Sequence, residues 1–233
     1  MEYMEYLKLA KEEIKSGLSP VSSDLAAFDE LWEETDFSRA PASAKYHLAI
    51  PHGLFIHSHL VWGNAVELNT RYGMSFSDRE LLVCSIFHDL CKTDLYIKEQ
   101  KWKKDESTGN RWQQYMAWDH KDQLPLGHGE KSLYLAQRLF SLTDLEAMAI
   151  RWHMGAYDAS MQDYAGRMSL NDAMKNPLVR LINLADLMTG MQEKKEAFFN
   201  VHIGVGFKFV LNPDLTINYA ESLGSMAEFQ DLL

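Results

Sequence analysis

The sequence is poor in cysteine, poor in basic residues and without a long apolar run. Its only two cysteines, Cys84 and Cys91, fall on one predicted helix, where their spacing does not suit a disulfide and gives no sign of an oxidising compartment. No segment approaches the roughly 18 apolar residues that span a bilayer. The charged N-terminus lacks the apolar core and the cleavage site of a signal peptide. We therefore expect a cytoplasmic protein with no membrane span.

The shortage of basic residues limits the partners that the chain can bind. It carries 23 lysines and arginines against 33 acidic residues, a net charge of −10. Neutralising the phosphates of a nucleic-acid duplex needs a basic surface, so we expect no duplex partner. A small anionic substrate held by metal ions is compatible with this charge. No sequence feature fixes the oligomeric state.

Apolar residues recur at helical spacing over most of the chain, so the predicted fold is mostly all-α. Two capping boxes (Ser77 with Glu80, Thr143 with Glu146) and the pair Asn176-Pro177 mark helix starts. Further helices are expected over residues 1–18, 24–35 and 54–72. We predict a single domain over 1–233, with a core at about 45–190, N-terminal helices in 1–40, and a C-terminal hairpin and tail in 195–233.

Two segments are strand-like instead and predict small β-hairpin insertions. The first covers residues 96–118, and the second covers 206–220 with its turn at 212–214. The first hairpin is polar apart from Trp102, Trp112 and Trp118. These tryptophans favour a hairpin that packs as a cover over another part of the protein, and a base-stacking platform is the alternative.

The chemistry of the chain centres on residues 81–92, LLVCSIFHDLCK. A buried carboxylate is costly unless it is paired, so Asp89 needs a partner, and a metal ion is the obvious one. In the preceding helix, His57 shares the core-facing stripe with Val61 and Ala65. His59 lies about 200° further round that helix and cannot serve the same site.

Six residues on the apolar sides or at the ends of helices are candidate metal ligands: His57, His88, Asp89, His128, His153 and Asp186. Imidazole with carboxylate suits Mn, Fe, Co, Ni or Zn. Six ligands exceed one ion's usual share and divide into two sites joined by a bridging carboxylate, an arrangement that activates water for attack on phosphorus. The competing explanations are hydrogen-bonded core histidines and a salt bridge from Asp186 to Arg180 or to a neighbouring helix.

The order of these residues resembles the HD-domain superfamily of metal-dependent phosphohydrolases, whose core motif is H…HD…D. IHSHLVWGNAVEL, FHDLCK and NLADLMTG carry the resemblance, which spans about residues 45–190. It implies an HD-type helical bundle in which His57, His88, Asp89 and Asp186 hold one divalent ion. It also implies a second ion at His128 and His153 with Asp89 bridging, and Lys92 beside the substrate phosphate. Mg is a further possible ion.

A closer likeness joins PASAKYHLAIPHGLFIHS and LPLGHGEKS to the HD portion of bacterial 3′→5′ exoribonucleases that carry an OB-fold before the HD domain. The chain departs from them in two ways. No basic, strand-rich segment precedes residue 45, and their GGL is HGL here.

We therefore expect an HD-family phosphohydrolase, cleaving a phosphoester of a nucleotide or a similar small phosphorylated substrate by a metal-activated hydroxide. Tyr157 and the hairpin near Trp118 are expected at the substrate. The alternatives are a 3′→5′ exonuclease on short single strands and a catalytically silent module that binds a nucleotide or a protein. His47, His52, His120 and His202 are expected in surface or structural roles, and both cysteines as small buried residues.

Overall fold

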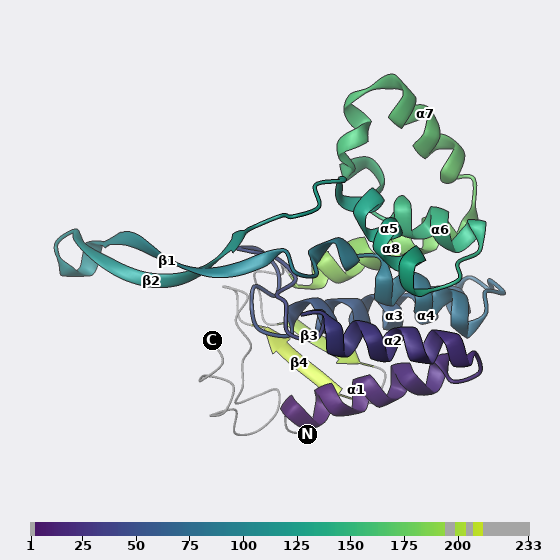
Figure 1. The fold of residues 1–233 in the computed structure, drawn as a ribbon, viewed down its shortest axis with the longest axis horizontal. Coiled ribbons are helices and arrows are strands. Elements are labelled where there is room, and N and C mark those ends of the chain that lie inside the picture. Colours follow the sequence, from purple (N-terminus) through teal and green to yellow (C-terminus); the bar gives the residue numbers. More distant parts are fainter. Residues whose placement is uncertain (1–2, 194–198, 204–206, 212–233) are drawn as a thin grey trace.

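The part of the chain that the structure describes is mostly helical, as predicted (Figure 1). A computed structural model describes residues 3–193, 199–203 and 207–211. Its helices are α1 (Tyr3–Leu18), α2 (Ser22–Glu34), α3 (Gly53–Arg71), α4 (Asp78–Phe87), α5 (His128–Leu139), α6 (Asp144–Arg151), α7 (Tyr164–Ala173) and α8 (Pro177–Glu193). Short 3₁₀ turns are η1 (Leu90–Lys92), η2 (Glu106–Thr108), η3 (Gly155–Tyr157) and η4 (Ala159–Gln162).

The helix starts that the sequence marks are confirmed. Ser77 and Thr143 each cap a helix in a complete capping box, with the glutamate three residues on closing the reciprocal bond. At α8 the side chain of Asn176 accepts a hydrogen bond from the amide of Leu178 at 2.9 Å, and Pro177 takes the first helical position.

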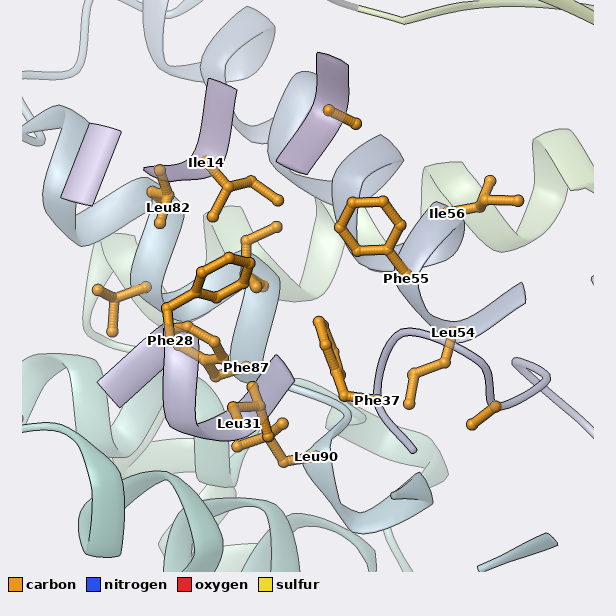
Figure 2. Packing of buried hydrophobic residues seen from close by; sticks show 14 of the residues in the cluster. Ile14, Phe28, Leu31, Phe37, Leu54, Phe55, Ile56, Leu82, Phe87 and Leu90 are labelled. Carbon is orange, nitrogen blue, oxygen red and sulfur yellow. The ribbon is translucent and has the colours of Figure 1, made fainter. Parts of the chain in front are cut away.

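The N-terminal helices share one buried cluster with α3 and α4. Phe28 of α2, Phe55 of α3 and Phe87 at the end of α4 all belong to it (Figure 2). Phe87 also stacks on Phe140 with ring centroids 4.1 Å apart. Burying such aromatic side chains is a main source of stability, and here it fixes the C-terminal end of α4, where the His-Asp pair begins.

A second buried cluster joins α3 and α4 to α6, α7 and α8. A polar link crosses it, because Asn64 of α3 donates to the Thr189 hydroxyl of α8 at 2.6 Å, and that hydroxyl donates to the carbonyl oxygen of Ala185. The link holds the helix that carries His57 against the helix that carries Asp186.

The helix through the His-Asp pair is shorter than predicted. α4 ends at Phe87 and the chain re-forms as η1, with Asp89 between them at φ −107° and ψ 21°. The prediction that Cys84 and Cys91 share one helix is therefore wrong. The break turns the backbone at Asp89, so that the pair and Lys92 face neighbouring helices.

The first hairpin consists of β1 (Tyr96–Asp105) and β2 (Arg111–His120), paired antiparallel from Tyr96 opposite His120 to Asp105 opposite Arg111. The prediction that it packs as a cover is wrong. The hairpin extends away from the helices as an arm (Figure 1), and Trp102 and Trp112 are 56% and 61% exposed.

The second hairpin differs from its prediction in its pairing. β4 (Phe207–Leu211) forms where the first predicted strand lies, but it pairs with β3 (Phe199–Ile203), which precedes it. The predicted turn at 212–214 lies outside the described residues. Within the described ranges no helix has the length and apolar character needed to cross a bilayer.

Candidate metal centre

All six candidate ligands converge on one place, although five different parts of the chain supply them. His57 comes from α3, His88 and Asp89 follow α4, His128 begins α5, His153 follows α6 and Asp186 lies on α8. Together with Cys91, their ligand atoms form three groups, each within 4.8 Å and so able to hold a metal ion: His57, His88 and Asp186; His88, Asp89 and His153; Asp89, Cys91 and His128.

Asp89 lies at the centre, and its two carboxylate oxygens face different histidines. Oδ1 is 2.7 Å from His128 Nε2 and 3.6 Å from His153 Nε2. Oδ2 is 3.4 Å from His88 Nε2 and 3.6 Å from His57 Nε2. One carboxylate therefore joins two groups of imidazoles, as a ligand shared between two metal ions does.

Two backbone carbonyls fix which ring nitrogens point inward. His88 Nδ1 lies 2.7 Å from the carbonyl oxygen of Ser85, and His153 Nδ1 lies 2.7 Å from that of Ile150. A carbonyl accepts only from N–H, so each Nδ1 carries a proton and each ring has its Nε2 left to face the centre. These are the ligand atoms that a divalent ion requires.

A buried nitrogen without a hydrogen-bond partner is consistent with a cation-binding site here. Among the described residues, His153 Nε2 is buried with no hydrogen-bond partner, and a buried lone pair of this kind is costly. With neighbouring carboxylates and imidazoles, the donor set suits a borderline divalent ion. The residues present therefore fit the ions that the motif implies.

Asp186 faces the histidines and not Arg180. Its Oδ1 lies 3.2 Å from His57 Nε2. The guanidinium of Arg180 instead donates to the carbonyl oxygens of Met174 and Lys175, at 2.9 and 3.4 Å. A hydrogen-bonded histidine partner explains how a carboxylate is accommodated on this helix. Burial opposes ionisation of Asp186, yet the histidines outweigh it and hold its pKa below the usual range.

Lys92 is buried and ion-paired with Asp89. Its Nζ lies 2.6 Å from Oδ2 of the carboxylate, three residues back in sequence. Burial alone raises the pKa of Asp89, but Lys92 and the neighbouring histidines outweigh burial and hold it well below the usual range. The same carboxylate raises the pKa of Lys92 against the effect of its own burial. Asp89 is therefore an anion and Lys92 a cation.

Cys91 belongs to this centre, which the sequence interpretation missed. Its Sγ lies 3.4 and 3.5 Å from the two ring nitrogens of His128. Burial lowers the pKa of His128, but the sulfur and the Asp89 carboxylate outweigh it and raise the pKa to about 9. The available signal was position, since Cys91 follows Asp89 by two residues on the same tight turn.

Close approach between backbone segments positions His153, which follows the end of α6. A Cβ at Gly129 would lie 2.1 Å from the carbonyl oxygen of Arg151, so glycine lets the start of α5 meet the end of α6. Gly155 has φ +53°, which glycine adopts without strain. The Asn183 amide packs against it and donates to the carbonyl oxygen of His153 at 2.5 Å.

A pocket of about 400 Å³ opens beside these residues. It is lined by His57, Asp89, Lys92, His128 and Asp186, and also by His47, Met154 and Tyr157. Tyr157 is 75% exposed and lines this pocket, and its expected contact with a substrate stays a prediction. His47, expected in a surface or structural role, also lines the pocket, with its ring 5.2 Å from that of His57.

His59 is excluded from the centre, as predicted from helical geometry. It hydrogen-bonds the Tyr6 hydroxyl at 3.0 Å and Glu13 at 3.3 Å, both on α1. Comparison of the chain with protein-family models, with curated proteins and with solved structures finds no match. Function is therefore inferred from the residues of the centre and its pocket.

Proposed function

We propose that the chain is a metal-dependent phosphohydrolase of the HD type, cleaving a phosphoester of a nucleotide or a similar small phosphorylated molecule. The observation that carries this proposal is the position of Asp89, whose two oxygens lie between two groups of histidines. A shared carboxylate is typical of sites that hold two ions for attack on phosphorus.

His57, His88, Asp89 and Asp186 would hold one ion, and Asp89, His128 and His153 the other. Divalent ions supply, when bound, a water activated for attack and positive charge against the phosphate oxygens. The protein sets the tautomers of the imidazole ligands and the charge of Asp89. The carbonyls of Ser85 and Ile150 keep two imidazoles in the ligating tautomer, and the anionic state of Asp89 leaves both of its oxygens able to ligate.

The pocket supports a small substrate. A volume of about 400 Å³ lies within the range of small-molecule sites, roughly 300–1,000 Å³. Lys92 lines it and places a permanent cation where a phosphate would enter. Tyr157 offers an exposed ring that could pack against a base or a sugar.

The test is hydrolysis by protein purified without chelator or histidine tag, assayed on nucleotides, phosphomonoesters and phosphodiesters with each of the candidate ions. We expect phosphate release that needs an added ion and is lost in Asp89→Ala. Asp172→Ala, which alters an exposed carboxylate on α7, is the matched control and should retain the wild-type rate. Hydrolysis and metal content both unchanged in Asp89→Ala would refute the proposal. Nucleotide binding without turnover under every ion would favour a silent binding module.

A further inference from the structure

The two faces of the β1–β2 arm differ in their side chains. Side chains alternate along a strand, and directly opposed residues share a face. The strand register therefore assigns one face, here called the aromatic face, which holds Tyr96, Lys98, Gln100, Trp102, Lys104, Trp112, Gln114, Met116, Trp118 and His120. It contains all three tryptophans of the arm, two lysines and no carboxylate.

The opposite face is balanced in charge, and its polar side chains bond one another. Lys101 pairs with Asp119 at 2.8 Å, and Gln113 donates to Asp105 at 2.6 Å. Its ionic groups therefore neutralise one another along the arm, whereas the lysines of the aromatic face have no acidic neighbour on that face. In a chain of net charge −10, this is a local cationic strip.

Cations and rings alternate on the aromatic face. Lys98 lies over the Trp118 ring at 5.0 Å, and Lys104 over the Trp112 ring at 5.5 Å. Trp102 and Trp112 are more than half exposed, although burial of tryptophan is the usual source of its stabilising effect. Exposed rings beside lysines are the combination that single-stranded nucleic acids use, with bases stacking on rings and phosphates meeting the cations.

The end of the arm that joins the helices lies toward the candidate metal centre. Lys98, Met116 and Trp118 line a recess of about 100 Å³ together with Ala49 and Pro51. The loop that holds Ala49 and Pro51 also holds His47, which lines the pocket of the centre. The recess at the aromatic face and the pocket of the centre are therefore lined by the same loop, residues 47–51.

We propose that the aromatic face of the β1–β2 arm binds single-stranded nucleic acid and directs one end of the nucleic-acid strand toward the pocket. Each strand of the arm has ten residues, a length of about 33 Å, enough for several extended nucleotides. Binding at the arm needs no hydrolysis, so the inference goes beyond the proposed function.

The experiment measures fluorescence anisotropy of labelled single strands of about ten nucleotides, oligothymidylate and oligouridylate, with chelator present. We expect wild-type protein to bind both, to lose affinity as salt rises, and to prefer them to a duplex of equal length. Trp102→Ala with Trp112→Ala should weaken binding more than about tenfold. Both rings are exposed, so these changes leave the core intact.

The matched control is Tyr115→Ala, which removes a ring beside Lys103 on the opposite face and should bind as wild type does. Equal loss in the tryptophan and tyrosine variants would overturn the proposal, as would wild-type protein that binds anionic lipid vesicles but no single strand. Mononucleotide hydrolysis without strand binding would overturn this inference and leave the proposed function standing. Strand binding without any phosphoester hydrolysis would support this inference and count against the proposed function.

Discussion

The Nε2 atoms of His57 and His88 face each other at 3.3 Å. His88 Nδ1 donates to the carbonyl oxygen of Ser85 at 2.7 Å, so Nε2 is the ring nitrogen that faces His57. A lone pair buried at such a distance needs a cation or a proton opposite it. With the carboxylates of Asp89 and Asp186 beside both rings, the side chains here could hold a divalent ion that meets this need.

Metal binding should stabilise the fold. An ion that binds only the folded chain at 100 times its Kd adds about 2.7 kcal/mol to the free energy of unfolding. Addition of Mn²⁺ or Co²⁺ to chelator-treated protein should therefore raise the melting temperature, as measured by calorimetry. The shift should be small or absent in Asp89→Ala. Equal melting temperatures for wild-type protein with and without ions would contradict the assignment.

The two groups of histidines should be separable. His128 lies on the Oδ1 side of Asp89, away from His57 and Asp186. His128→Asn should therefore lower the metal content from about two ions per chain to about one, as counted by elemental analysis. His120→Asn, on the arm, is the control and should leave the content unchanged. Loss of both ions together would show that the centre is one indivisible site.

Arg79 should be important for stability and not for chemistry. Its guanidinium bonds Asp24 at 2.7 Å and also bonds Glu146, whose side chain is fully buried. Arg79→Ala would leave a buried carboxylate without this partner, which costs about 3 kcal/mol. Urea denaturation should show this loss. A variant as stable as wild type would mean that Glu146 is satisfied by its capping-box bonds alone.

Asp158 should contribute stability that depends on pH. Burial raises its pKa, but bonds from Ser160 and from Arg151 at 2.7 Å outweigh burial and hold the pKa below its usual value. A depressed pKa stabilises the folded state above the unfolded value of about 3.9 and loses that effect as pH falls through the folded value. Asp158→Asn should therefore be less stable than wild type near neutral pH. In urea titrations the difference should shrink below about pH 4; a constant difference would contradict this account.

Local rules predicted the helices and placed the six candidate side chains on apolar faces or at helix ends. Their spread over several helices of a predicted bundle indicated that they could gather at one place. Capping boxes at Ser77 and Thr143 act within four residues, and the helical period sends His57 and His59 to opposite sides. The end of α4 at Phe87 was not predictable in this way. The apolar pattern continues through Leu90, and tertiary packing breaks the helix at the His-Asp pair.

The residues missed by sequence interpretation depend on contacts between distant segments. His47 lies in a loop without periodicity, and the fold alone brings it to the pocket. Cys91 has the composition of an ordinary core residue until the start of α5 places His128 beside it. For the tryptophans of the arm the sequence interpretation was wrong in the opposite direction. Their apolar character suggested packing, whereas the strand register collects them on one exposed face.

The central claim is that Asp89 joins two metal sites, and metal content per chain tests it most directly. Protein purified without chelator or histidine tag, then reconstituted with Mn, Fe, Co, Ni, Zn or Mg, should contain about two ions per chain by elemental analysis. One ion would restrict binding to a single group and assign His128 and His153 to another role. No ion after reconstitution would contradict the account, since the inward-facing imidazole lone pairs would then need a different explanation.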